Sequence, residues 1–318
     1  MEPSQMKASV IIPCYNGPEF IRSCLDCFRI QTHLDFEVVV VDDGSDHPLD
    51  IDPDTYPFSL RILSHPKNRG RAAARNTGVR AARNDLIIFL DSDMIVSSDF
   101  IAAHVAAHEL GECGAIVGDI RFTDQWSGQP LAKYFDTRGA AKLKSGKEIP
   151  YRYFVTGNAS TRKSLLISIG LFDEGFPKYG GEDLELACRL HEQGIRFAHC
   201  PAARSLHDDL PSIARHRRRM EEYGRYCLPY LVENHHYAAD FLKLEWAGHG
   251  EQRRLSARIK QLAGTLFFRR PIITFLIFLV NFFPLTHGYL PRKFSFFLFD
   301  VITGGSYLIG YRRSLIEK

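Results

Sequence analysis

Short apolar runs rich in β-branched residues alternate with longer amphipathic stretches through the first half of the sequence. The runs at 9–13, 36–41 and 85–90 are predicted to be buried strands, and the consecutive valines of the second run require burial on both faces of a sheet. The amphipathic stretches at 19–31 and 71–83 are predicted to be helices. Strands and helices in this order indicate an α/β fold built around a mostly parallel sheet.

The same pattern continues beyond the first hundred residues. Further strands are predicted at 60–64, 115–122 and 196–199, and further helices at 98–110, 161–169 and 182–192. The region 123–150 is polar and carries few signals of regular structure. A loop of that length in a compact domain is often a functional lid or a binding segment.

Charge divides the chain into two parts. Residues 1–203 hold 22 Lys and Arg against 27 Asp and Glu, a net charge of −5, whereas residues 204–318 hold 18 against 10, a net charge of +8. A basic segment suggests nucleic acid or an anionic membrane as its partner. The arginines here stand beside long aromatic and aliphatic runs, so we expect a membrane surface and no nucleic acid.

The C-terminal apolar runs at 271–283 and 294–311 each fall short of the roughly 20 residues that cross a bilayer. Asp300 and the pair Gly304 and Gly305 interrupt the second run. A re-entrant hairpin, or two helices in the plane of the membrane, fits at least as well as two spans. The alternative is that both runs form a hydrophobic dimer interface or cover a soluble core, so a homo-oligomer stays open.

Cysteine usage and the N-terminus bear on the compartment. The seven cysteines are odd in number and scattered, which fits a reducing environment. Cys24 and Cys27 have the spacing of a redox or metal pair, but no second pair exists and both fall in a predicted helix, so we expect structural thiols. The N-terminus lacks the basic start and apolar core of a secretory signal, which places the first part of the chain in the cytosol.

Asp91 and Asp93, separated by Ser92, directly follow the apolar run at 85–90. Two carboxylates at a strand end can share a Mg²⁺ or Mn²⁺ ion with a pyrophosphate, because hard oxygen ligands suit these ions. The alternative is an acidic turn that caps the helix beginning near Ser98. The apolar run favours the functional interpretation, since its burial would place both acids at the rim of the sheet, where open α/β sheets bind ligands.

Two further polar segments stand close to predicted strand and helix ends. Asp42 and Asp43 follow the valine strand, where one acid could accept a hydrogen bond from a nucleobase or a ribose hydroxyl; a β-turn opened by aspartate explains them equally well. Arg69, Arg71 and Arg75 lie on a loop and the first turns of the next helix. Arginines at a helix N-terminus favour a diphosphate, and a solvated basic helix is the alternative.

Glu182 and Asp183 open a predicted helix directly after Gly180 and Gly181. The helix dipole favours acids in the first turn, so a capping cluster is the simple explanation. The functional alternative makes Asp183 a general base for a hydroxyl group, with Glu182 orienting the molecule that carries it. His207 follows a predicted strand and could complete a metal site, although a lone histidine is more often structural.

Taken together, these segments resemble family 2 glycosyltransferases of the GT-A fold. The matching segments follow the order of the family's motifs across residues 8–207, about two-thirds of the chain. They are 9–16, 41–46, 76–78, 91–93, 156–158 and 180–185. One departure is that Asp46 directly follows Ser45, where the family often has a residue between the two.

The resemblance implies a role for each donor-binding candidate. Asp43 would meet the nucleobase of a nucleotide-sugar donor, and Pro13 and Tyr15 would wall the base pocket. Arg71 would contact the diphosphate. A uridine donor is the commonest case in the family.

The remaining candidates divide between the metal and the reaction. Asp91 and Ser92 would lie against the donor, and Asp91, Asp93 and His207 would bind the divalent metal, Mn²⁺ or Mg²⁺. Asp183 would remove the acceptor proton in an inverting transfer. All these roles are what the resemblance implies.

The sequence therefore predicts a GT-A type α/β sandwich at 1–210 and a basic, apolar, helical extension that associates with a membrane at 211–318. The expected activity is transfer of a sugar from a UDP-sugar or similar donor to a lipid-linked or polysaccharide acceptor. The expected place is the cytoplasmic face of the inner membrane, held there peripherally or by C-terminal segments.

Three alternatives share parts of this pattern. A sugar nucleotidyltransferase needs a glycine-rich triphosphate loop near the N-terminus, and residues 14–17 do not form one. A Rossmann dehydrogenase needs a G-x-G-x-x-G motif after the first strand, which is missing. A catalytically silent membrane scaffold with a degenerate transferase fold is opposed by the acids at 43, 91, 93 and 183.

Overall fold

The structure, a computed structural model, describes residues 6–143, 148–176, 178–250, 255–282 and 292–317. The chain forms two compact units. We call the first the sheet unit; it holds Met1–Gln125, Phe135–Glu174 and Glu182–Asp209. We call the second the helical unit; it holds Trp126–Tyr134, Gly175–Gly181 and Leu210–Lys318.

The sheet unit is built on a mixed sheet that contains nine strands among the described residues. The strands are β1 (Ala8–Cys14), β2 (Phe36–Asp42), β3 (Ser59–Ser64), β4 (Leu86–Leu90), β5 (Met94–Val96), β6 (Ala115–Phe122), β7 (Glu148–Ile149), β8 (Asn158–Arg162) and β9 (Phe197–His207). Their order across the sheet is β3-β2-β1-β4-β8-β6-β9-β5, and β7 pairs with β9. Strands β1 to β4 run parallel, whereas β8 runs antiparallel to both of its neighbours.

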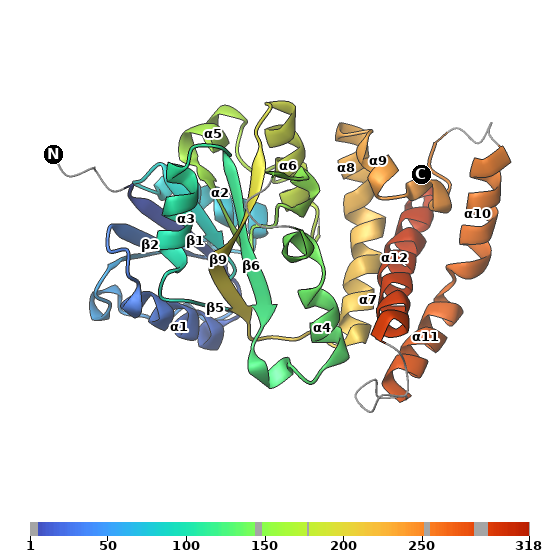
Figure 1. Cartoon of the computed structure of the whole chain (residues 1–318), viewed down its shortest axis with the longest axis horizontal. Helices are drawn as coiled ribbons and strands as arrows, with labels where there is room; N and C mark the ends of the chain where they lie inside the picture. The colour runs from blue at the N-terminus through green and yellow to red at the C-terminus, as the bar shows by residue number, and fades with distance from the viewer. Residues whose placement is uncertain (1–5, 144–147, 177, 251–254, 283–291, 318) are drawn as a thin grey trace. The chain divides into compact units, whose positions relative to one another are not determined.

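Helices cover both faces of this sheet (Figure 1). They are α1 (Pro18–Asp26), α2 (Arg71–Ala81), α3 (Phe100–Glu109), α5 (Lys163–Ser168) and α6 (Glu182–Glu192). Shorter 3-10 turns are η1 (Cys27–Ile30), η2 (Pro53–Thr55), η3 (Asp124–Trp126), η4 (Gly139–Lys142) and η5 (Tyr151–Tyr153). The predicted α/β sandwich is confirmed, with α1 and α3 packed on one face and α2, α5 and α6 on the other.

Two apolar cores lie on the two faces of the sheet. Alternate residues of each strand contribute to opposite cores, as Ile11 and Val39 do on one face and Val10 and Val38 on the other. This double burial explains why β1, β2 and β4 are almost continuously apolar. The seven cysteines are all free, and the buried Cys24 is part of the core beneath α1.

The helix predicted at 161–169 is wrong at its start, because a strand, β8, runs through Arg162 and α5 begins only at Lys163. β8 has a polar sequence, Asn-Ala-Ser-Thr-Arg, yet its first four residues are buried. Hydrogen bonds make that burial affordable: the ring of His104 pairs with Ser160 at 2.8 Å and with Asn158 at 3.0 Å. Apolar periodicity cannot reveal a strand buried in this way.

Two other sequence predictions underestimated the regular structure: one strand is longer than predicted, and one predicted loop contains a helix. The predicted strand at 196–199 extends through His207, and a register shift between Gly118 and Asp119 lets β9 follow β6 past Pro201. The region predicted to be loop-rich, 123–150, contains the helix α4 (Pro130–Asp136) as well as η3, η4 and β7.

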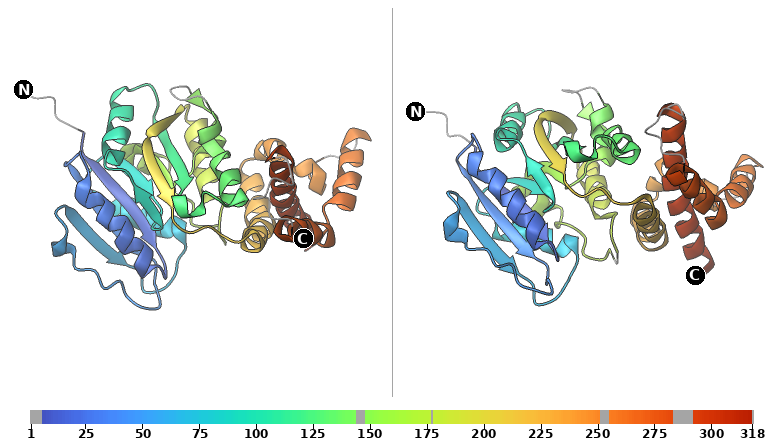
Figure 2. Two further views of the ribbon diagram at one scale, coloured as in Figure 1. Left: turned by 60° about the horizontal axis from the view of Figure 1, so that its bottom comes forward. Right: turned by 90° about the horizontal axis from the view of Figure 1, so that it is seen from below.

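Most of the helical unit, Leu210–Lys318, follows the sheet unit in sequence. Its helices are α7 (Ile213–Glu222), α8 (Leu228–Asn234), α9 (Ala238–Phe241), α10 (Leu255–Phe267), α11 (Arg270–Phe282) and α12 (Arg292–Glu317). A π-helical turn, η6 (Tyr223–Cys227), joins α7 to α8, and a 3-10 turn, η7 (Leu244–Ala247), follows α9. α12 packs along α7 and η6, side by side with α7 in Figure 2.

The residues expected to interrupt the last apolar run do not break α12. The carboxylate of Asp300 accepts a hydrogen bond from the hydroxyl of Tyr134 at 2.9 Å. Gly305 allows a close approach, since a Cβ atom there would lie 2.8 Å from side-chain atoms of both Ile273 and Phe268. α12 is long and apolar enough to cross a membrane, but 56% of its most apolar 18-residue window is buried within the structure. Burial of that kind is also found in the core helix of a soluble protein.

Candidate active site

The carboxyl ends of the parallel strands β1, β2 and β4 bring the predicted donor-binding residues to one edge of the sheet. Asp43 directly follows β2, and its backbone N–H donates to the carbonyl oxygen of Cys14 at the end of β1. Asp91 directly follows β4, and its N–H donates to the carbonyl oxygen of Gly157, which precedes β8. Pro13 lies inside β1, and the exposed ring of Tyr15 follows it.

A buried arginine forms the centre of this edge, and its partners are carboxylates, whereas the sequence offered it as one of three arginines that could meet a diphosphate. Arg75 of α2 is 1% exposed, and its guanidinium contacts three carboxylates. Its Nη2 lies 3.0 Å from Asp91, and its Nη1 lies 2.9 Å from Glu182 and 3.3 Å from Asp183. Burial lowers the pKa of Arg75, but the carboxylates of Asp183, Asp91 and Glu182 raise it by more, so it stays charged.

Arg75 therefore joins the acid that follows β4 to the two acids that open α6. The signal that could have revealed it is its setting: the surrounding helix residues are small or apolar and buried. They are Ala72, Ala73, Ala74, Gly78 and Val79. A charged side chain in such a face needs an internal partner.

Asp183, the predicted base, is fixed from two sides. The Thr156 hydroxyl donates to its Oδ1 at 2.5 Å, and the Thr156 N–H donates to Oδ2 at 3.3 Å. Burial raises the pKa of Asp183 to about 6; Arg75 and Thr156 oppose this, and Glu182 and Asp91 add to it. A carboxylate with that pKa can both accept and release a proton near neutral pH.

Asp91 and Asp93 take different partners, although the sequence predicted them to share a metal ion. Burial raises the pKa of Asp91, but Arg75, Arg71 and His207 lower it by more, so Asp91 stays ionised. Asp93 lies beside His207, because Met94 pairs with His207 where β5 runs antiparallel to β9. The Nδ1 atom of His207 is 3.4 Å from Oδ2 of Asp93.

The chemistry of these side chains fits a divalent cation in part. His207 Nδ1 is buried and faces the Asp93 carboxylate, so an imidazole nitrogen and a carboxylate oxygen stand together. Asp91, the third predicted ligand, pairs instead with Arg75. No three His, Cys, Asp or Glu side chains of the described residues are grouped closely enough to hold a metal ion.

The other predicted residues have distinct surroundings. Arg71 is exposed at the start of α2, and its charge lowers the pKa of Asp91, so it stands near that carboxylate. Ser92 is half-buried in the turn between β4 and β5, near the thiol of Cys14. Glu182 is buried against Arg75, so its role in orienting an acceptor stays a prediction.

Asp43 is buried, and both of its oxygens are engaged within the protein. Oδ1 accepts from the backbone N–H of Arg69 at 2.9 Å and lies 2.7 Å from Nδ1 of His65, and Oδ2 accepts from the N–H of Gly70 at 2.8 Å. A carboxylate oxygen can accept two hydrogen bonds, so Oδ2 keeps one further position. Contact with a nucleobase stays a prediction for this residue.

The sheet order and the acid cluster at its edge define a GT-A type transferase. The model of glycosyl transferase family 2 matches residues 9–170, which is half of the chain. A second model, described as the N-terminal domain of galactosyltransferase, matches residues 138–214. The chain therefore belongs to glycosyl transferase family 2, as its motifs indicated.

Curated relatives agree with this assignment. The chain is 33% identical over 258 residues to the uncharacterized glycosyltransferase YfnE of Bacillus subtilis, covering 65% of this chain and 66% of the relative. It is 29% identical over 248 residues to hyaluronan synthase of Pasteurella multocida, covering 66% of this chain and 25% of that enzyme. The chain thus spans less than two-thirds of the length of these relatives.

Solved structures share the fold. The mannosyltransferase PcManGT from Pyrobaculum calidifontis, in complex with GDP-Man and Mn²⁺, superimposes with a TM-score of 0.57 at 22% identity. The match covers 98% of this chain and 88% of that one. At that level of identity the similarity establishes the fold alone.

Replacing Arg75 should destabilise the sheet unit, since Arg75→Met leaves three clustered carboxylates without their shared cation. We expect the free energy of unfolding to fall by at least ~3 kcal/mol. A urea titration followed by circular dichroism would show this as a lower midpoint. The loss should shrink as the pH is lowered from 8 to 5, because the carboxylates then gain protons and lose their mutual repulsion.

The matched control is Arg80→Met on the same helix. Arg80 is exposed and forms one long contact of 3.9 Å with Glu174, so the free energy of unfolding should stay within about 0.5 kcal/mol of that of the unchanged protein. Equal midpoints for the Arg75 and Arg80 variants would contradict the structural role given to Arg75.

Proposed function

We propose that this chain is an inverting glycosyltransferase that moves a sugar from a nucleoside-diphosphate sugar, with UDP as the nucleotide, to a hydroxyl of a lipid-linked or polysaccharide acceptor. The observation that carries the proposal is the guanidinium of Arg75, which contacts both Asp91 and Asp183. The side chain of Arg75 thus links Asp91, predicted to lie at the donor, with Asp183, predicted to act as the base.

The reaction follows from that arrangement. Asp183 accepts the proton of the acceptor hydroxyl as the hydroxyl oxygen bonds to the anomeric carbon of the donor sugar. The bond from that carbon to the diphosphate breaks on the opposite face, and the nucleoside diphosphate leaves with the electron pair, so the configuration inverts. Thr156 and Arg75 fix the orientation of the Asp183 carboxylate. Arg71, exposed beside Asp91, meets the charge on the leaving diphosphate.

Asp93 and His207, with Asp91 close by, would hold the divalent metal, Mn²⁺ or Mg²⁺. Such an ion would supply positive charge to the diphosphate. The buried Nδ1 of His207, 3.4 Å from the Asp93 carboxylate, supports this choice of ligands. The Mn²⁺ and GDP-Man named for PcManGT support a metal and a nucleotide sugar of this kind.

A polysaccharide acceptor is supported by the named product of one relative, hyaluronan synthase. We further propose that residues 1–210 are the catalytic domain and that 211–318 attach it to the cytoplasmic face of a membrane. Exposed apolar side chains recur at helical spacing along α10 and α11. They are Ile259, Leu262, Leu266, Ile272, Phe275 and Phe278.

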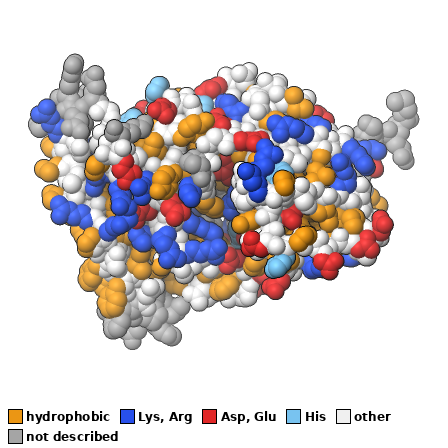
Figure 3. All heavy atoms as spheres, turned by 180° about the vertical axis from the view of Figure 1, so that it is seen from behind, with side chains coloured by type: hydrophobic (Ala, Val, Ile, Leu, Met, Phe, Trp, Pro, Cys, Tyr) orange, Lys and Arg blue, Asp and Glu red, His pale blue; other side chains and the backbone are white. Residues whose placement is uncertain are grey.

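Basic residues accompany this apolar face. Arg258 and Arg269 are exposed on and beside α10, and Lys293 is exposed at the start of α12. Lys and Arg side chains gather beside hydrophobic ones over the helical unit in Figure 3. Apolar and basic side chains together suit helices that lie in the plane of an anionic membrane surface, and the partial burial of α12 opposes a free span.

The test of the proposed activity is a screen of nucleotide sugars for release of nucleoside diphosphate, with and without a membrane lipid extract. We expect release from a UDP-sugar that needs Mn²⁺ or Mg²⁺, rises with the extract, and stops when EDTA removes the metal. Unchanged release in EDTA would contradict the metal site. No release from any donor, with metal and extract present, would overturn the proposed function.

Asp183→Asn should lower kcat by about a thousandfold while donor affinity, measured by calorimetry with metal, stays within about twofold. In the unchanged enzyme, kcat/KM should fall tenfold per pH unit below about pH 6, because the protonated Asp183 carboxyl cannot accept the acceptor proton. The matched control, Asp99→Asn, alters an exposed carboxylate at the start of α3 and should change neither value. Loss of donor affinity in the Asp183 variant would remove it from the role of base.

Leu262→Ser combined with Phe275→Ser should weaken membrane binding, since both side chains are more than half exposed on the apolar face. We expect the protein to sediment with vesicles of anionic phospholipid at low salt, and the double variant to bind at least about tenfold more weakly. The matched control, Ile30→Ser with Leu110→Ser, removes exposed apolar side chains from the sheet unit and should bind normally. Equal sedimentation of both double variants would contradict attachment through α10 and α11.

A further inference from the structure

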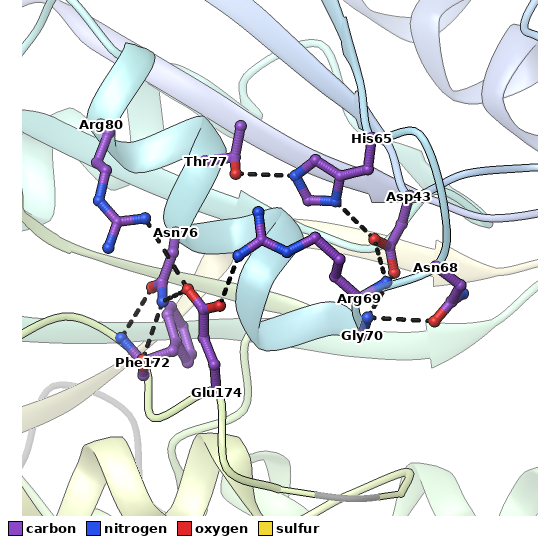
Figure 4. A network of polar contacts seen from close by, with 10 residues as sticks. All are labelled: Asp43, His65, Asn68, Arg69, Gly70, Asn76, Thr77, Arg80, Phe172 and Glu174. Atoms are coloured by element: carbon purple, nitrogen blue, oxygen red, sulfur yellow. Dashed lines mark hydrogen bonds and ion pairs between the residues drawn. The ribbon is translucent and has the colours of Figure 1, made fainter.

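A loop that follows β3 is held by Asp43, as Figure 4 shows. The Asp43 carboxylate accepts hydrogen bonds from the backbone N–H groups of Arg69 and Gly70. It also pairs with Nδ1 of His65, and Nε2 of the same ring lies 2.9 Å from the hydroxyl of Thr77. The loop lies against the turn after β2, because a Cβ atom on Gly44 would come within 2.3 Å of the Lys67 backbone. Residues 65–70 are thus fixed beside the predicted donor contacts Asp43 and Arg71.

A second segment, 172–174, is held by α2. The side-chain amide of Asn76 donates to the carbonyl oxygen of Phe172 at 2.9 Å, and its oxygen accepts from the Phe172 N–H at 2.9 Å. The ring of Phe172 packs edge-on against Phe89 at 5.3 Å, inside the core. The chain continues from this segment towards Glu182 and Asp183.

Glu174 connects the loop with the segment. Its Oε1 accepts the second amide hydrogen of Asn76 at 2.9 Å, so that both N–H groups of the Asn76 side chain are hydrogen-bonded. Its Oε2 accepts from Nη2 of Arg69 at 2.9 Å, a charge-assisted bond that reaches the loop. The carboxylate of Glu174, at the end of the second segment, therefore bonds both Arg69 of the loop held by Asp43 and Asn76 of α2 (Figure 4).

We propose that Glu174 is a positioning residue for sugar transfer, which sets the donor loop 65–70 and the segment leading to Asp183 in register through Arg69 and Asn76. The inference rests on the proposed function, since it needs the donor and the base to serve one reaction. It assigns Glu174 no contact with either substrate. Its two oxygens act on different steps: the bond to Arg69 acts on donor binding, and the bond to Asn76 acts on turnover.

The test uses Glu174→Gln, Arg69→Gln and the double variant in the full chain. Calorimetry with nucleoside diphosphate and Mn²⁺ gives Kd, and sugar transfer at saturating donor gives kcat. We expect Kd to rise about threefold to fivefold in each single variant and no further in the double variant, because both remove one partly exposed ion pair. We expect kcat to fall about tenfold in Glu174→Gln and in the double variant, because a misplaced base slows the reaction, and to stay near normal in Arg69→Gln.

The matched control is Arg80→Gln, which removes a more distant charge 3.9 Å from the same carboxylate and should leave Kd and kcat unchanged. Glu174→Asp tests rescue: it keeps the charge but shortens the reach, so its kcat should lie between those of the unchanged enzyme and Glu174→Gln. A purely structural role predicts instead a lower melting temperature, with normal Kd and kcat for the folded fraction.

Two results separate the failures. Normal Kd and kcat in Glu174→Gln, or additive increases of Kd in the double variant, would overturn the positioning role while leaving an active glycosyltransferase. Absence of transfer by the unchanged chain with every donor would overturn the proposed function and the inference with it. If Glu174→Gln does not fold, Arg69→Gln and Glu174→Asp still give the required comparison.

Discussion

The buried guanidinium of Arg75 needs the three carboxylates around it, and that need brings α2, the end of β4 and the start of α6 to one point. One cation among three acids leaves net negative charge in a confined space. Its effects differ between the acids: the pKa of Asp91 is lowered, whereas that of Asp183 is raised to about 6. One cluster thus keeps an ionised acid beside an acid poised to exchange a proton.

The elements that the sequence predicted well are those in which burial follows periodicity. β1, β2 and β4 are apolar because both of their faces are covered, and the hydrophobic pattern reports this directly. β8 was not predicted, because its buried residues are polar and form hydrogen bonds with residues far along the chain, such as Asn158 with His104. Hydrogen bonding between distant residues leaves no periodic trace in the sequence.

The sequence predicted which acidic residues form the site but not which residues they contact. Family motifs pointed to Asp91, Asp93 and Asp183, yet Arg75 was one of several arginines, and its partner Glu182 lies 107 positions away. Asp91 and Asp93 stand in a turn between β4 and β5 rather than in an extended strand, so two residues of separation do not place them on one face. One therefore turns to Arg75 and the other to His207.

The packing of α12 along α7 and η6 has a consequence for the architecture of membrane attachment. Gly224 and Gly310 lie against opposing backbone, so the helices meet at distances that no side chain could tolerate. α12 is thus part of the packed interior of the helical unit as well as an apolar segment. Shortening the chain to obtain a lipid-free enzyme would remove an internal support, whereas changing the outward residues of α10 and α11 would leave that support in place.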